Sequence, residues 1–298
     1  MEKDGRKKNI SAPDILVVIR GQKTYNGARK QEEKTTMLKF GMPTLIEIPE
    51  PEQCAALCRE LELSFVEMNM NLPQYQVQTM DVSRLKGIAK EYGIGYTIHL
   101  DENMNVADFN PLVAGAYRQT VLDTITLAKE LEIPVLNMHF PLGVYFTLPD
   151  RKVYVMGEYP EKYRERMEVF RDACTAAIGD SGIRICVENW SGYADWQLPA
   201  LDALLQSPAF GLTYDVGHNF CKDGVDEPVI LARKAHLHHM HIHDVKDGIR
   251  DHQALGTGQL DKFKYLDLAR QQDCTVVVET KTVDGLRQSV RWLREHQF

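Results

Sequence analysis

RICVENW, at residues 184–190, is a short apolar run that ends in polar residues, the first of which is Glu188. Runs of this length are typical of strands that are buried on both faces of a parallel sheet. Seven similar runs lie elsewhere between residues 37 and 298, and longer segments with apolar residues three and four positions apart separate them. This alternation predicts βα units around a parallel sheet.

The predicted elements fill one domain. We predict strands at residues 38–42, 64–70, 96–100, 135–140, 184–190, 211–216, 237–244 and 275–279. We predict helices at residues 52–63, 82–92, 111–131, 160–178 and 261–272. Eight such units favour an α/β fold of the closed (β/α)8 TIM barrel type over an open doubly wound sheet.

Length and composition agree with a single barrel. The chain has 298 residues and is 44% hydrophobic, which suits one barrel of about 250 residues with a short extension. We predict a poorly ordered N-terminal extension at residues 1–36 and a barrel at 37–298 with a metal site at its C-terminal face. The sequence has no long apolar run and no signal-peptide pattern, so we expect a cytoplasmic protein that does not enter membranes.

The charge of the expected barrel narrows the class of substrate. The whole chain has a net charge of −7, but residues 1–36 hold nine bases and five acids, which leaves residues 37–298 near −11. An acidic surface repels phosphate backbones and argues against a nucleic acid substrate. No P-loop or other nucleotide-binding motif stands out. We therefore expect a small-molecule substrate and no nucleotide cofactor.

Acidic and imidazole side chains mark seven of the eight predicted strands. They are Glu67, His99, His139, Glu188, Asp215, His241 and Glu279. Strand ends meet at one rim of a barrel, where the active sites of such folds lie. Buried carboxylates need counter-charges, and few Lys or Arg residues occupy these strand ends. We therefore predict a divalent metal, with oxygen and imidazole ligands that suit Mn, Mg, Co or Zn.

The seventh strand contains five histidines between residues 236 and 243. Strand alternation places His239, His241 and His243 on one face. The distance from the strand end favours His241 as the metal ligand, with His239 deeper in the barrel. His243 is left as a substrate contact or as a support for the ligands.

Five motifs in order resemble the xylose-isomerase-like barrels, a group with sugar and sugar phosphate isomerases and epimerases, inosose dehydratase and apurinic endonuclease IV. The motifs are CVEN at 186–189, TYDVGH at 213–218, HIHDVK at 241–246, LGTG at 255–258 and VVE at 277–279. The resemblance implies that Glu188, Asp215, His241 and Glu279 bind the metal. It also implies that Glu188 and Glu279 move a proton beside a metal-bound carbonyl, through an enediolate, in a sugar or cyclitol.

The resemblance and the polar pattern together give a set of expected substrate contacts. They are His218, His99, His139, His243, His252, Trp190 and Lys281. The ketose epimerases of the group carry a second glutamate where this chain has Ala194, so the isomerase or epimerase class is expected without a particular ketose. Many similar proteins form dimers or tetramers, which makes a homo-oligomer an expectation by analogy.

Two other functions stay open from the sequence. His99, His139, His218 and His252 resemble positions that hold additional zinc ions in endonuclease IV, which leaves a second metal and an apurinic endonuclease activity as alternatives. Arg250 replaces the aspartate of the third zinc site there, so that cluster looks incomplete. The second alternative is a barrel that binds a sugar without converting it.

Overall fold

The structure is a computed structural model, and it describes residues 37–298. The extension predicted at residues 1–36 lies outside the described residues. Eight parallel strands form a closed barrel in the order β1-β12-β9-β8-β7-β4-β3-β2. The strands are β1 (Lys39–Pro43), β2 (Phe65–Asn69), β3 (Gly95–His99), β4 (Val135–His139), β7 (Arg184–Glu188), β8 (Phe210–Asp215), β9 (Leu237–Ile242) and β12 (Thr275–Val278). Each overlaps a predicted strand, and the predicted TIM barrel is confirmed.

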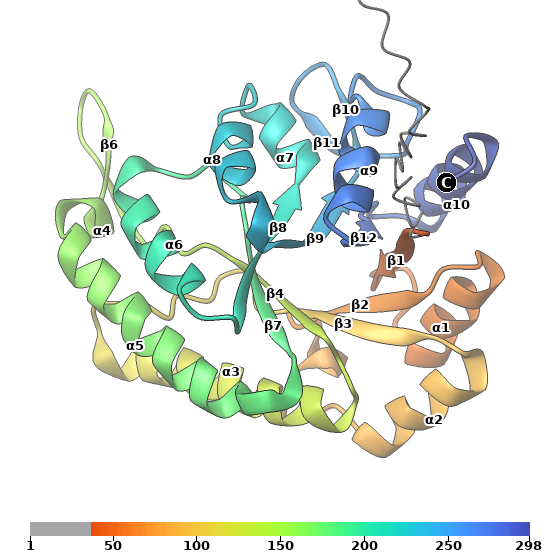
Figure 1. Cartoon of the computed structure of the whole chain (residues 1–298), viewed down its shortest axis with the longest axis horizontal. Coiled ribbons are helices and arrows are strands. Elements are labelled where there is room, and N and C mark those ends of the chain that lie inside the picture. The colour runs from red at the N-terminus through yellow and green to blue at the C-terminus, as the bar shows by residue number, and fades with distance from the viewer. Residues whose placement is uncertain (1–36) are drawn as a thin grey trace, which may run out of the picture. The chain divides into compact units, whose positions relative to one another are not determined.

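Helices follow the strands and cover the outside of the barrel (Figure 1). They are α1 (Pro51–Glu60), α2 (Val82–Tyr92), α3 (Pro111–Glu130), α4 (Val155–Glu158), α5 (Pro160–Ile178), α6 (Leu198–Leu205), α7 (Val216–Cys221), α8 (Glu227–Ala232), α9 (Lys262–Gln271) and α10 (Val283–Glu295). All five predicted helices are present. Within residues 37–298, no helix combines the length and the apolar character that crossing a membrane requires.

Local sequence explains where several helices begin and end. Pro160 lies at the first helical position of α5, where its missing N–H costs no hydrogen bond. The side chain of Asp81 caps α2 by accepting a hydrogen bond from the backbone N–H of Arg84. Gly93 then ends α2 with a φ of 67°, a conformation that glycine adopts without strain.

Two hairpins extend the loops at the C-terminal side of the barrel, and the sequence did not predict them. β5 (Tyr145–Thr147) pairs with β6 (Lys152–Tyr154), and β10 (Asp244–Lys246) pairs with β11 (Arg250–Gln253). The second hairpin explains why the predicted strand 237–244 is too long. The barrel strand ends at Ile242, and the chain enters β10 after His243.

Strand register sets the level of the polar side chains. Asp215 on β8 lies opposite His241 on β9, and His241 lies opposite Val277 on β12. Side chains at opposite positions of neighbouring parallel strands point to the same side. Glu279 follows Val277 by two residues and therefore points into the barrel mouth as well.

Candidate metal centre

Four neighbouring strands each carry one ionisable side chain to the same place at the C-terminal end of the barrel. Nδ1 of His241 lies 3.2 Å from Oε2 of Glu279, which follows β12 directly. The same nitrogen lies 3.6 Å from Oε1 of Glu188 at the end of β7. It lies 3.8 Å from Oδ2 of Asp215 at the end of β8. We call these four residues the upper layer, and they are the four ligands that the sequence predicted.

The upper layer is buried and incompletely hydrogen-bonded. Glu279, its most exposed member, retains 7% of its accessible surface. Nδ1 of His241 and Oε2 of Glu279 have no hydrogen-bond partner within the described part of the chain. A buried polar atom without a partner costs about 1–3 kcal/mol. A divalent cation would satisfy these atoms and balance the three carboxylates, so the residues present fit a bound metal.

Glu188 is held from the β3–β4 side of the barrel. Nδ2 of Asn137 donates a hydrogen bond to Oε2 of Glu188. Nε2 of His99 lies 3.4 Å from the same oxygen, and Nε2 of His139 lies 3.8 Å from it. Burial lowers the pKa of His99, but the hydrogen bond and the charge of Glu188 outweigh burial and raise it to about 9. His99, His139 and Glu188 are a second group whose side-chain atoms lie close enough together to hold a metal ion.

His139 lies on the wall of the site rather than at its floor. Its ring stacks on Trp190, with 5.1 Å between ring centroids. Burial lowers the pKa of His139 to about 4, and it outweighs the charge of Glu188, which acts to raise that pKa. Trp190 is fixed in turn, because its Nε1 donates a 3.0 Å hydrogen bond to the carbonyl of Phe140. The stacked pair therefore presents a rigid, uncharged surface.

A second polar group lies directly below the upper layer. Oε2 of Glu67 on β2 accepts hydrogen bonds from Oγ1 of Thr97 and Nε2 of His239, each at 2.9 Å. We call Glu67, Thr97 and His239 the lower layer. Oε1 of Glu67 lies 2.9 Å from Nε2 of His241. Burial raises the pKa of Glu67, but His241 and His239 outweigh burial and hold it well below its usual value.

Asp215 has a structural role besides its place in the upper layer. Its Oδ1 accepts a 2.6 Å hydrogen bond from the backbone N–H of His218 and so caps α7. Nε2 of His243 lies 3.2 Å from Oδ1 and 3.3 Å from Oδ2 of Asp215. Burial raises the pKa of Asp215, but the His218 and His243 imidazoles outweigh burial and lower it.

Glu279 differs from the other acids because one of its oxygens is paired and one is free. Oε1 lies 2.8 Å from Nζ of Lys281, whereas Oε2 faces His241. Burial raises the pKa of Glu279, but the Lys281 ammonium and the His241 imidazole hold it well below its usual value. Glu279 therefore stays anionic at the edge of the site.

A cavity of about 690 Å³ lies above the upper layer. The predicted substrate contacts that line it are His99, His139, Trp190, His218, His252 and Lys281. Glu67 and Glu279 also reach it. His243 was predicted there as well, but its side chain is fully buried beneath the wall.

Loops after β2 and β3 add a polar wall that sequence reasoning missed. It consists of Asn69, Asn71, Glu102 and Asn103. Nδ2 of Asn69 donates a 3.1 Å hydrogen bond to Oε1 of Glu102, and Nδ2 of Asn71 donates a 2.8 Å bond to Oδ1 of Asn69. Amide and carboxylate groups of this kind suit a substrate with several hydroxyls. Their position just after predicted strands was the available signal.

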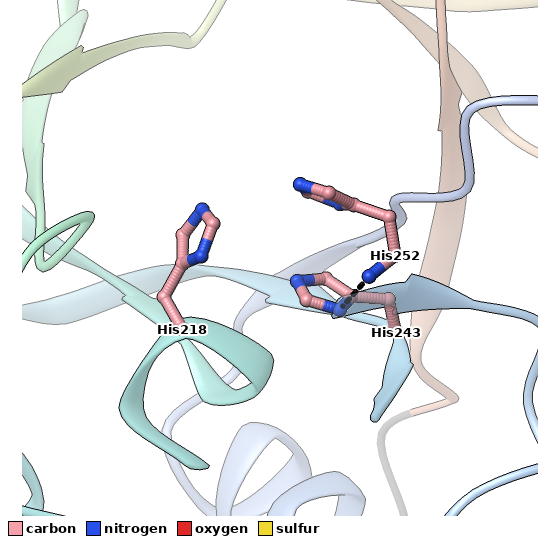
Figure 2. Close-up of side chains that lie close together, drawn as sticks. All are labelled: His218, His243 and His252. Atoms are coloured by element: carbon pink, nitrogen blue, oxygen red, sulfur yellow. Dashed lines mark hydrogen bonds between the residues drawn. The ribbon is translucent and has the colours of Figure 1, made fainter. Parts of the chain in front are cut away.

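Three imidazoles lie together beside the upper layer (Figure 2). They are His218 on α7, His243 between β9 and β10, and His252 on β11. Their ring nitrogens are close enough together to hold a metal ion. However, the backbone N–H of His252 donates a 2.8 Å hydrogen bond to Nδ1 of His243, drawn dashed in Figure 2. This nitrogen is therefore already occupied.

Comparison with known proteins agrees with this geometry. The model of the family described as "Xylose isomerase-like TIM barrel" matches residues 55–296. Buried His, Glu and Asp clusters of the kind found here are consistent with a metal site.

Solved structures with the same fold include sugar epimerases and a dehydratase. D-allulose 3-epimerase from Methylomonas sp., solved with D-allulose, is 16% identical, with a TM-score of 0.66 over 88% of this chain and 97% of that one. The 3-keto-D-glucoside 4-epimerase of E. coli is 16% identical, with a TM-score of 0.70 over 87% and 100%. The probable 3-DHS dehydratase of Bacillus anthracis is 12% identical, with a TM-score of 0.64 over 86% and 99%. At these identities the likeness shows the fold alone.

Proposed function

Because the chain belongs to the xylose isomerase-like TIM barrel family, we propose that it is a divalent-metal-dependent isomerase or epimerase. Its substrate would be a sugar, a sugar phosphate or a cyclitol with a carbonyl group. The metal would be Mn, Mg, Co or Zn, bound by Glu188, Asp215, His241 and Glu279. The residues His99 and His139, together with Glu188, leave room for a second ion.

One observation carries this proposal. Three carboxylates from three strands converge on Nδ1 of His241, a buried nitrogen that has no hydrogen-bond partner among residues 37–298. Glu279 of this arrangement lines a cavity large enough for a sugar. Packing alone does not account for it, because uncompensated buried charges are costly.

The chain's own residues would carry the proton. The metal, when bound, polarises a substrate carbonyl and so acidifies the neighbouring C–H. Glu279 lines the cavity, so its carboxylate would accept that proton. Glu188 lies across His241 from Glu279 and would return a proton from the other side. Both carboxylates are buried.

The walls of the cavity would bind and orient a hydroxylated substrate. Trp190 offers a flat apolar face, which suits the carbon side of a sugar. Lys281, His218 and His252 offer donors or acceptors near Glu279 and Asp215. A carboxylate or phosphate on the substrate could also pair with Lys281.

Exchange of a substrate C–H proton with D₂O tests the proposal. The full chain, loaded with Mn²⁺, would be incubated with a panel of ketoses, ketose phosphates and inososes, and deuterium incorporation followed by NMR. We expect incorporation with at least one compound, and loss of incorporation in Glu279→Gln. Glu165→Gln, an exposed carboxylate on α5 that does not line the cavity, is the matched control and should retain exchange. Full exchange in Glu279→Gln contradicts the assigned base.

The alternative of an apurinic endonuclease is supported by the gathering of His99 and His139 at Glu188. The charge near −11 of residues 37–298 opposes it, because phosphate backbones are repelled. Arg250, which replaces the aspartate of the third zinc site of endonuclease IV, forms an exposed ion pair with Asp247, and this also opposes the alternative. Incubation with an oligonucleotide that contains an abasic site separates the two functions. Metal-dependent nicking would overturn the sugar proposal.

A barrel that binds a sugar without converting it is the remaining alternative. It predicts saturable binding of a sugar with no C–H exchange across the whole panel. The free oxygen of Glu279 beside the cavity favours turnover, because a binding site has no need of an unpaired buried carboxylate.

A further inference from the structure

His243 occupies a break between two strands rather than a strand face. β9 ends at Ile242 and β10 begins at Asp244, so His243 alone joins the barrel to the β10–β11 hairpin. Its side chain is fully buried. In Figure 2 its ring lies between His252 and the beginning of α7, which carries His218.

Hydrogen bonding fixes which nitrogen of His243 carries the proton. The backbone N–H of His252 donates to Nδ1 at 2.8 Å. A backbone amide is only a donor, so Nδ1 must accept and carries no hydrogen. The neutral ring then has its proton on Nε2. That nitrogen lies 3.2 Å and 3.3 Å from the two oxygens of Asp215, which are acceptors.

The surroundings of the ring are shaped for this position. A Cβ added to Gly217 on α7 would lie 2.0 Å from Cε1 of His243, so glycine is needed there. His252 has a positive φ of 51°, an uncommon conformation for a residue with a side chain. Its backbone N–H points at His243 in that conformation. Three segments that are separate in the sequence thus meet around one imidazole.

We propose that His243 is a positioning residue, which transmits the order of the β10–β11 hairpin to the metal ligand Asp215. The proposal rests on the proposed metal centre. His243 is neither a third imidazole ligand beside His218 and His252 nor a substrate contact, because its Nδ1 is occupied and its Nε2 donates to Asp215. Groups that orient metal ligands in this way change metal affinity by about 10–100-fold when they are removed.

The arrangement gives His252 two separable parts. Its backbone N–H supports His243, whereas its side chain lines the cavity. Replacing the side chain of His252 therefore leaves the support of Asp215 in place. If the three imidazoles formed a metal site instead, the same replacement would remove a ligand.

Mn²⁺ binding to the metal-free full chain, measured by titration calorimetry, tests the proposal. We expect His243→Leu and His243→Asn to bind Mn²⁺ about 10–100-fold more weakly than wild type. The side-chain amide of Asn reaches only the position of Nδ1 of His243, and not the position of Nε2, from which Asp215 is contacted. His243→Gln places an amide N–H near the position of Nε2 and should bind within a few-fold of wild type. Gly217→Ala should lose affinity although His243 is retained, because the added Cβ displaces the ring. His252→Ala should lose less affinity than His243→Asn, because its backbone N–H still supports His243 although its contact with Glu279 is removed.

Each outcome bears on one claim. Wild-type affinity in His243→Asn and Gly217→Ala overturns the positioning role. Loss of affinity in His252→Ala as large as in His243→Asn supports an imidazole cluster and also overturns it. Thermal unfolding of each metal-free variant separates loss of affinity from loss of fold, and the Gly217 variant carries the test if His243→Leu does not fold. Absence of binding of Mn²⁺, Mg²⁺, Co²⁺ and Zn²⁺ alike by wild type overturns the proposed function. In that case ¹⁵N NMR spectra of the His243 ring still test the hydrogen bond from the backbone N–H of His252 to Nδ1. A proton on Nδ1 contradicts that hydrogen bond.

Discussion

The two polar layers of the barrel differ in how completely their hydrogen bonds are made. In the lower layer, Oε2 of Glu67 accepts from both Thr97 and His239. In the upper layer, Oε2 of Glu279 and Nδ1 of His241 have no hydrogen-bond partner among the described residues. Both layers bury carboxylates and imidazoles to a similar degree. Burial alone therefore does not separate a structural network from a functional site.

The difference shows what each layer does for the protein. A satisfied buried network stabilises one arrangement of the strands, because breaking any contact exposes a partner without compensation. An unsatisfied one is retained against its cost only if a ligand completes it. The lower layer also faces the upper one, since Glu67 contacts Nε2 of His241 and leaves Nδ1 turned toward the three acids. The lower layer thus supports the upper one.

Substitution of an upper-layer acid should remove activity without cost to the fold. Glu279→Gln is expected to lower the rate of C–H exchange by about 10²–10⁴-fold, which is the usual contribution of a general base. The unfolding temperature of the metal-free protein should change little, because the contact that is lost, with Lys281, is half exposed and a charge close to two other carboxylates is removed with it. Exchange assays and thermal unfolding measure the two effects. A large loss of stability would show that Glu279 is structural.

The lower layer should give the opposite result. Glu67→Ala leaves the buried His239 without its anionic partner and removes the contact at Nε2 of His241. Breaking a buried pair by removing one partner costs about 3–5 kcal/mol. Urea unfolding of the metal-free protein measures this cost, with Glu279→Gln as the control in the other layer. Equal stability of the two variants would remove the distinction between the layers.

The sequence predicted the upper layer better than the lower one for a physical reason. Glu188, Asp215 and Glu279 end strands, and all strand ends of a parallel barrel meet at one rim, so strand phase is enough to gather them. The partners of Glu67 depend on hydrogen bonds between particular side chains of different strands. Spacing along one strand does not contain that information.

The two hairpins and the strand break at His243 could not be predicted from the sequence, for a related reason. β5, β6 and β10 have three residues each and β11 has four, which is too short for a periodic pattern to identify them. The strand break at His243 follows from the close approach of Gly217 and from the backbone of His252, both of which are tertiary contacts. The predicted continuous strand 237–244 is wrong at that point, although β9 itself was predicted.

Metal addition should stabilise the protein through the upper layer alone. At a Mn²⁺ concentration 100 times the Kd, binding adds about 2.7 kcal/mol to the free energy of unfolding. For a domain of this size, that is a rise of about 5–10 °C in Tm. Calorimetry with and without EDTA measures it. Asp215→Asn should abolish most of the rise, whereas Thr97→Val in the lower layer should retain it.

The smallest effect comes from two buried hydroxyls, one with a hydrogen-bond partner and one without. Oγ1 of Thr97 donates a 2.9 Å hydrogen bond to Glu67, whereas Oγ1 of Thr213, on β8 two residues before Asp215, has no partner within the described chain. Both side chains are buried. Valine replaces threonine at similar volume, so Thr97→Val should cost about 1–2 kcal/mol and Thr213→Val should be neutral or stabilising, because it removes an unpaired buried hydroxyl. Urea unfolding of the two metal-free variants compares them directly. Equal losses would mean that the hydroxyl of Thr213 has a partner that appears only in solution, and the two neighbourhoods would then differ less than their hydrogen bonds indicate.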